Sequence, residues 1–168
     1  MIFDSKNIKN YIFSKANKRI TKTGSPSLSY LISNKGERVY LSVSLTEKPS
    51  FSLKILRNPF ISICAGVAFD SSRFTLDFQA ARCFDENSYW WKIENGHAYY
   101  QSGGFTNENK TVTVSVDFRR KEISYAVDGQ SVGDPEFMNL TDEEMQQLRP
   151  TVQIKYKGDS DDSVELVD

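Results

Sequence analysis

The stretch that decides the fold is Val112-Thr113-Val114-Ser115-Val116-Asp117-Phe118, followed by the turn Arg119-Arg120-Lys121-Glu122 and by Ile123-Ser124-Tyr125-Ala126-Val127. Apolar and polar side chains alternate in both segments, which is typical of strands that place one face on a core. The polar turn between them predicts an antiparallel hairpin. Asp128-Gly129 follows and suits a second tight turn, because both residues tolerate positive φ angles.

The same alternation extends outward from this hairpin in both directions. Residues 61–69 are nearly all apolar, which favours a central strand rather than a half-exposed one. The other expected strands are residues 39–45, 51–55, 74–78, 152–156 and 164–167, of which the last two close the chain.

One segment departs from the alternation. Thr141 stands three residues before Glu144, which is the spacing of a helix capping box, and Pro150 would stop a helix that continued that far. We therefore expect a short helix near residues 141–148. The expected fold class is all-β, an antiparallel two-sheet β-sandwich with this one short helix.

Length, charge and cysteine content limit the possible classes of protein. The 168 residues can bury one apolar core without a disulfide or a metal, and the net charge of −1 favours neither nucleic acid nor a membrane as a partner. Met1 is not followed by the apolar core of a signal peptide, and no apolar run is long enough to span a membrane. Cys64 and Cys83 lie in apolar, strand-like stretches and are expected to be reduced and buried. We expect a cytoplasmic protein.

Several pieces of sequence stand in an order that matches one known family. Residues 112–118 and 123–133 form a strand ending in Asp, a hairpin and a polar-Gly turn, and residues 148–154 and 162–166 form a closing pair of strands. Residues 63–69 contain a central Gly-Val strand, and an aromatic hairpin follows at residues 88–96. In these features the chain resembles the SPRY domain family, a concanavalin-like jelly-roll β-sandwich.

The resemblance implies a function as well as a fold. Members of the family are mostly non-catalytic protein-interaction modules, including adaptors and substrate receptors of ubiquitin ligases. The implied role is a module that recognises a peptide or protein surface through loops at one end of the sandwich. We expect residues 1–168 to form a single monomeric SPRY-like domain, of which residues 1–20 match weakly and form an N-terminal extension.

The dipeptide Asn95-Gly96 predicts a two-residue turn, which fixes the register of the aromatic hairpin. Side chains alternate along each strand, so Trp91 is expected on the core face and Trp90 on the other face. The pairs expected next to the turn are Glu94 with His97 and Ile93 with Ala98.

The expected binding residues are aromatic and polar side chains in loops or at exposed strand positions. Exposed aromatic residues are typical anchors of protein interfaces, although Trp90 could instead cover a second core beneath a loop. A carbohydrate-binding lectin on a similar sandwich is the alternative function, because stacked aromatics beside Asn and Asp acceptors would also suit a sugar. The predicted partner-binding residues are Phe84, Asp85, Asn87, Tyr89, Trp90, Tyr99 and Phe137.

The sequence offers little for catalysis or metal binding. His97 is the only histidine, and no close set of Cys and His residues accompanies it as a zinc site would need. Asp159, Asp161 and Asp162 lack the central glycine and the final glutamate of an EF-hand loop. No Gly-x-Ser-x-Gly motif is present. We expect no enzyme activity, no cofactor and no metal.

Overall fold

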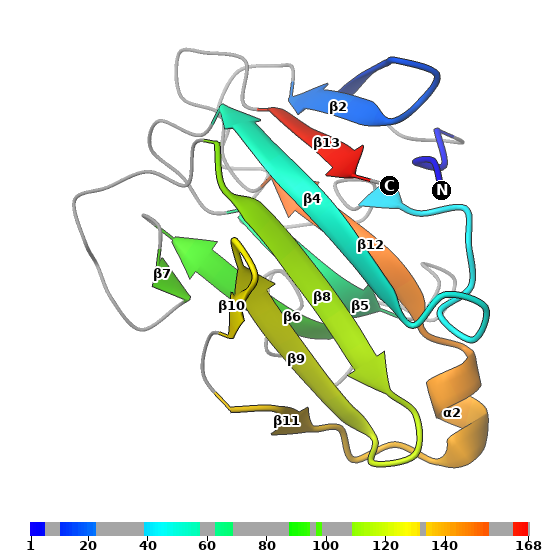
Figure 1. Ribbon diagram of the computed structural model, residues 1–168. Helices are drawn as coiled ribbons and strands as arrows, with labels where there is room; N and C mark the ends of the chain where they lie inside the picture. The colour runs from blue at the N-terminus through cyan, green and yellow to red at the C-terminus, as the bar shows by residue number, and fades with distance from the viewer. Residues whose placement is uncertain are drawn as a thin grey trace, which may run out of the picture.

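The computed structural model describes residues 1–5, 11–22, 39–57, 63–68, 88–94, 97–98, 109–131, 134–154 and 163–167. Within these residues the chain folds into two antiparallel sheets that stack on each other (Figure 1). The first sheet has the order β1 (Tyr11–Ser14), β2 (Arg19–Lys22), β13 (Ser163–Val167), β4 (Ser50–Arg57), β8 (Thr111–Asp117), β9 (Glu122–Val127) and β10 (Gln130–Ser131), with β11 (Glu136–Phe137) also paired to β9. We call it the eight-stranded sheet.

The second, five-stranded sheet lies behind the first in Figure 1. Its order is β3 (Val39–Tyr40), β12 (Arg149–Ile154), β5 (Ile63–Ala68), β6 (Ser88–Glu94) and β7 (His97–Ala98). The helix α2 (Asp142–Gln146) precedes β12. The predicted all-β, two-sheet sandwich is confirmed, and β5 lies between β12 and β6 as a central strand should.

The hairpin that decides the fold has the predicted register. β8 pairs with β9 from Val112 opposite Val127 to Asp117 opposite Glu122. Five apolar side chains of the two strands face the second sheet and are at most 5% exposed, namely Val112, Val114, Val116, Ile123 and Tyr125. The polar side chains between them face outward. The following turn has positive φ at both Asp128 and Gly129, as the Asp-Gly dipeptide predicts.

The helix and the second hairpin also follow their sequence signals. The Thr141 hydroxyl accepts a hydrogen bond from the Glu144 N–H at 3.1 Å, and the Glu144 carboxylate accepts one from the Thr141 N–H at 2.9 Å. In the aromatic hairpin, Glu94 lies opposite His97 and Ile93 opposite Ala98, which confirms the register expected next to the turn. The strand expected at residues 74–78 lies outside the described residues.

The strand expected over residues 39–45 is too long. β3 ends at Tyr40, although Val39, Leu41 and Leu45 are all fully buried. The Leu41 N–H still donates to the Pro150 carbonyl of β12 at 3.0 Å, but Pro150 has no N–H to return a bond. The Ser42 N–H donates to the Ile2 carbonyl, and residues 44–48 form a turn instead of continuing the strand.

The two closing strands lie in different sheets. β12 pairs with β3 and β5, whereas β13 pairs with β2 and β4. The last part of the chain therefore crosses from one layer of the sandwich to the other. In the described part of the chain, no helix is long and apolar enough to cross a membrane.

The first residues connect the edges of the two sheets. The Phe3 N–H donates to the Asn17 carbonyl in the β1–β2 turn at 2.8 Å, and Phe3 also forms an isolated bridge with Leu41, which follows β3. The Ile2 carbonyl accepts a hydrogen bond from the Ser42 N–H at 2.9 Å. The Phe3 side chain is fully buried in the core that fills the space between the sheets.

Candidate partner-binding surface

Several connections meet at one end of the sandwich, which we call the α2 end (Figure 1). It consists of the loop 46–49, the β8–β9 turn 118–121, residues 134–138 and α2. Three contacts hold these parts together: the Val116 N–H donates to the Pro49 carbonyl at 2.8 Å, the Met138 N–H donates to the Lys121 carbonyl at 2.7 Å, and the Lys121 ammonium lies 2.9 Å from the Asp142 carboxylate.

Phe137 is the most exposed large apolar side chain of the described residues, at 65%. It lies on β11 opposite Glu122, so the pairing with β9 fixes its backbone. The next residue, Met138, is fully buried and belongs to the core. An anchored backbone with one neighbour in the core holds the Phe137 ring in solvent.

The β8–β9 turn beside Phe137 is closed by its own side chains. The Asp117 carboxylate accepts hydrogen bonds from the N–H groups of Arg119 and Arg120, both at 2.9 Å. Lys121 has a φ of 55° and donates from its ammonium to the Leu140 carbonyl at 2.9 Å, in addition to its ion pair with Asp142. The turn and the start of α2 therefore form one connected unit.

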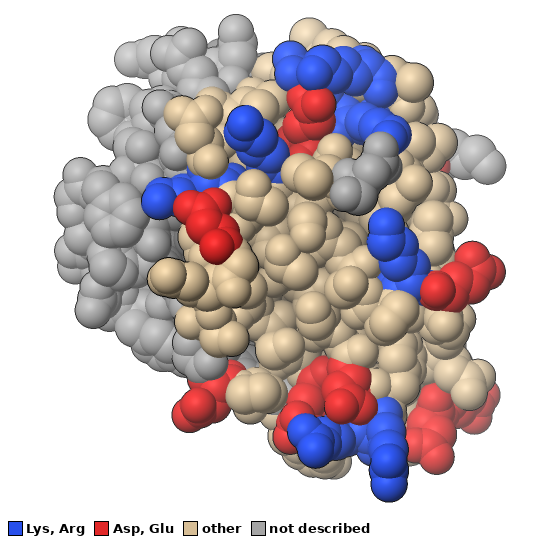
Figure 2. All heavy atoms as spheres, in the orientation of Figure 1, with Lys and Arg blue, Asp and Glu red and all other residues tan. Residues whose placement is uncertain are grey.

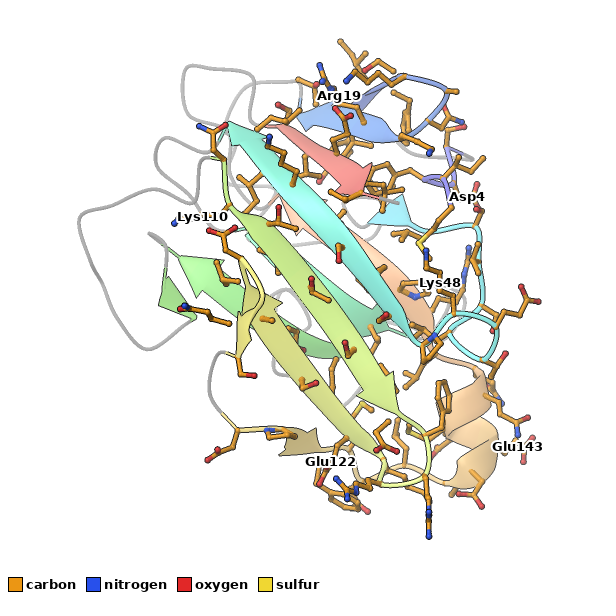
Figure 3. All side chains as sticks on the ribbon, in the orientation of Figure 1. Asp4, Arg19, Lys48, Lys110, Glu122 and Glu143 are labelled. Carbon is orange, nitrogen blue, oxygen red and sulfur yellow. The ribbon has the colours of Figure 1, made fainter. Side chains whose placement is uncertain are left out.

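Charged side chains of both signs surround this unit. Arg119 and Arg120 are exposed at the tip of the turn, and no carboxylate among the described residues pairs with their guanidinium groups. Glu122 lies beside Phe137, and Glu143 lies on the exposed side of α2 (Figure 3). The α2 end thus combines an exposed apolar ring with exposed cations and carboxylates, which suits contact with a protein surface.

The sheet topology brings part of the predicted site to the same end. Ser88, the first residue of β6, lies opposite Ala68, and Ala68 lies opposite Arg149, which follows α2 closely in the chain. Tyr89 and Trp90 come next in β6, with Tyr89 opposite the buried Val67 and Trp90 opposite Gly66. The two aromatic residues therefore occupy neighbouring cross-strand rows near the α2 end.

Phe84, Asp85, Asn87 and Tyr99 lie outside the described residues. The sequence identifies residues 119–122 as a polar turn but does not show that Lys121 joins this turn to α2. No local pattern shows this contact, because Lys121 and Asp142 are far apart in the chain.

The described residues contain no group of three His, Cys, Asp or Glu side chains placed to hold a metal ion. The α2 end provides apolar area together with hydrogen-bond donors and acceptors. Two paired strands and a capped helix fix the backbone that carries them. This arrangement is suited to binding.

Comparison with known proteins gives a likeness of structure alone. No family model matches the chain, and no curated protein gives a significant sequence match. The SPRY domain of human HERC1 matches with a TM-score of 0.56 and 15% identity, over 99% of this chain and 97% of that chain. The Neuralized NHR1 domain of Drosophila melanogaster matches with a TM-score of 0.64 and 11% identity, again over 99% and 97%.

A third match, the stonustoxin structure, has a TM-score of 0.60 and 15% identity and covers 99% of this chain but 26% of that chain. The first two matches align nearly end to end with domains of similar size. They confirm the predicted resemblance at the level of the fold: this chain has the β-sandwich fold of the SPRY domain.

Proposed function

We propose that this chain is a non-catalytic protein-interaction module that binds a peptide or protein surface through the α2 end, as an adaptor or substrate-receptor domain would. The SPRY fold supports the proposal, because the family that the sequence resembles consists mostly of such modules. The observation that carries it for this chain is the Phe137 ring, 65% exposed on a backbone that β9 and the buried Met138 hold in place.

An exposed aromatic ring on a fixed backbone is well suited to anchor a partner. A phenylalanine has few rotatable bonds, so little side-chain entropy is lost when the ring is buried in an interface. Its large apolar area gives a favourable free energy when a partner covers it. Aromatic anchors near the centre of an interface commonly contribute 2 kcal/mol or more to binding.

The proposed surface extends from Phe137 toward β6. Tyr89 and Trp90 are included because the start of β6 lies at the α2 end. Phe84, Asp85, Asn87 and Tyr99 remain in the proposal on sequence grounds alone.

The proposal can be tested by replacing Phe137 and a matched exposed residue. Ile12 is 58% exposed on β1, at the opposite edge of the eight-stranded sheet from β9 and β11. Wild-type protein, Phe137→Ala and Ile12→Ala would serve as parallel baits in native cell extract, and the Kd of the recovered partner would then be measured by calorimetry. We expect Phe137→Ala to weaken binding about 30-fold and Ile12→Ala to leave the Kd within about threefold.

Both side chains are largely in solvent, so neither variant should change the unfolding temperature by more than about 2 °C. A partner that binds wild-type protein and Phe137→Ala with equal Kd would show that the α2 end is not the binding surface.

A further inference from the structure

The outward side chains of the eight-stranded sheet form a band without charge. Strand register places Ser50 beside Ser115 and Ser115 beside Ser124, and the adjacent row runs from Val167 through Ser52 and Thr113 to Ala126. The hydroxyl oxygens of Ser52 and Thr113 lie 2.8 Å apart. We call these residues the hydroxyl band: Ser50, Ser52, Thr113, Ser115, Ser124, Ala126 and Val167.

Charged rows border the hydroxyl band on two sides. Along one border Arg19 lies opposite Glu165, and Glu165 lies opposite Lys54. Along the other border Asp117 lies opposite Glu122. Figure 2 shows this face as a tan area with charged side chains of both signs toward β2 and toward the β8–β9 turn.

Most of these bordering charges already have partners within the chain. Glu165 accepts hydrogen bonds from Lys15 at 3.0 Å and from Arg19 at 2.8 Å. The Asp117 carboxylate is bonded to the N–H groups of the β8–β9 turn. Lys54 and Glu122 differ: no oppositely charged side chain among the described residues lies within ion-pair distance of either.

Lys54 and Glu122 lie on opposite sides of the centre of β8. Lys54 is opposite Thr111, the first residue of β8, from the β4 side, and Glu122 is opposite Asp117, the last residue, from the β9 side. The ends of β8 are roughly 20 Å apart at about 3.4 Å per residue. Consider a two-fold axis in the plane of an interface that crosses β8 between Thr113 and Ser115, perpendicular to the line from Lys54 to Glu122. Such an axis would place each Lys54 opposite the Glu122 of the other copy.

We propose that the hydroxyl band is a face on which a second copy of this chain docks, with reciprocal Lys54–Glu122 ion pairs at its two borders. Small side chains let two sheets approach to about 10 Å, the ordinary spacing of stacked sheets. Val167, 42% exposed at the edge of the band, adds apolar area. The chain is then a dimer at high concentration and not the monomer expected from its sequence.

The area of the hydroxyl band sets the expected affinity of the dimer. Four strands and the length of β8 span roughly 15 Å by 20 Å, about 300 Å² of projected area for each copy. A standard stable interface buries about 800 Å² on each partner. The dimer should therefore be weak, with a dissociation constant between about 100 µM and about 1 mM, and it should weaken as salt screens the ion pairs.

The geometry has a consequence for binding that does not depend on which surface holds the partner. This axis runs across β8 and not along it, so the two copies direct their α2 ends away from each other. A dimer would present two separate copies of any site located there, and a partner with two binding sequences would gain effective affinity from both.

Charge reversal provides a test that only a symmetric dimer passes. In Lys54→Glu protein both reciprocal contacts become Glu–Glu, and in Glu122→Lys protein both become Lys–Lys, so each variant alone should dimerise at least tenfold more weakly. In an equimolar mixture each contact is again Glu–Lys, so a mixed dimer should form with wild-type strength. The double variant Lys54→Glu/Glu122→Lys should also dimerise with wild-type strength, because both of its contacts are Glu–Lys pairs. Sedimentation equilibrium of the full chain, up to about 1 mM protein, measures the dimer dissociation constant of the wild type, of each variant and of the mixture.

Circular dichroism would first show that each variant is folded. If either reversal disturbs the fold, Ser115→Arg, which places a bulky charge at the centre of the band, should abolish the dimer, whereas Ile12→Arg at the sheet edge should not. A wild-type chain that stays monomeric to about 1 mM, a dimer indifferent to both reversals, or single variants that do not recover on mixing would each overturn the proposal.

Discussion

At the scale of single residues, Glu165 holds the β1–β2 hairpin to the rest of its sheet. It lies on β13 and pairs with Lys15 in the β1–β2 turn and with Arg19 on β2. Hydrogen bonds from Lys15 and then from Arg19 lower the pKa of the Glu165 carboxyl below its ordinary value of 4.5. Because the folded state favours the ionised form, this group stabilises the fold whenever it is charged.

The pH dependence of stability tests this network. Glu165→Gln should lower the free energy of unfolding by on the order of 1 kcal/mol at pH 7, since the pairs are partly exposed and screened by water. The contribution is fully present above the ordinary pKa and is lost as the pH falls through the lowered pKa of the folded state. The difference between wild-type and variant in urea unfolding should therefore be constant near neutral pH and shrink below about pH 4.5.

Glu143→Gln is the matched control, because Glu143 is exposed on α2 and has no ion pair among the described residues. Its effect on unfolding should be negligible at every pH. A Glu165→Gln difference that persisted unchanged down to pH 2.5 would show that the ion pairs do not cause it.

At the scale of secondary-structure elements, α2 is short and depends on its cap. The helix spans five residues, too few to be stable through its own backbone hydrogen bonds. Its capping box satisfies N–H groups at its start, and Met145 and Leu148, 2% and 1% exposed, attach the segment to the core. Lys121 adds the link to the β8–β9 turn.

Removing the cap should lower stability without changing the fold. Thr141→Ala leaves the Glu144 N–H without its acceptor and should cost about 1 kcal/mol in urea unfolding. Thr141→Ser retains the hydroxyl and should stay within about 0.5 kcal/mol of wild type. Equal losses in the two variants would mean that the Thr141 methyl group, and not the hydrogen bond, stabilises this segment.

At the scale of the whole molecule, the first five residues join the two layers. Phe3 is bonded to the β1–β2 turn of one sheet, bridges to Leu41 beside the other sheet, and is fully buried between them. Replacing it with alanine removes a large core side chain and leaves a cavity where the two sheet edges meet. We expect Phe3→Ala to lower the free energy of unfolding by about 3–5 kcal/mol.

Ile2 provides the comparison, because it is the neighbouring residue and is 39% exposed. Ile2→Ala keeps the backbone hydrogen bonds of this segment and should cost less than about 1 kcal/mol in thermal or urea unfolding. Similar losses for the two variants would contradict a specific role of the Phe3 ring in joining the sheets.

The sequence by itself determined the features that depend on neighbouring residues. Alternation between Val112 and Val127 defined the central hairpin, Thr141 and Glu144 defined the helix start, and Asn95-Gly96 defined a register. Each of these follows from side-chain direction or hydrogen bonding within a few positions along the chain. The candidate site was harder to predict from the sequence. The sequence could propose Phe137 as an apolar contact, but it could not predict that Phe137 is held beside the β8–β9 turn and α2.

The tertiary structure alone decided which segments became neighbours. β3 ends at Tyr40 because its partner strand β12, more than a hundred positions away, has Pro150 at the next position, which offers no N–H. The closing strands lie in different sheets because their pairing partners are β5 and β4. Likewise, the rows of the hydroxyl band combine residues from four strands. A strand's alternation shows that it has a buried face, but strand order depends on contacts between distant residues, which no local pattern contains.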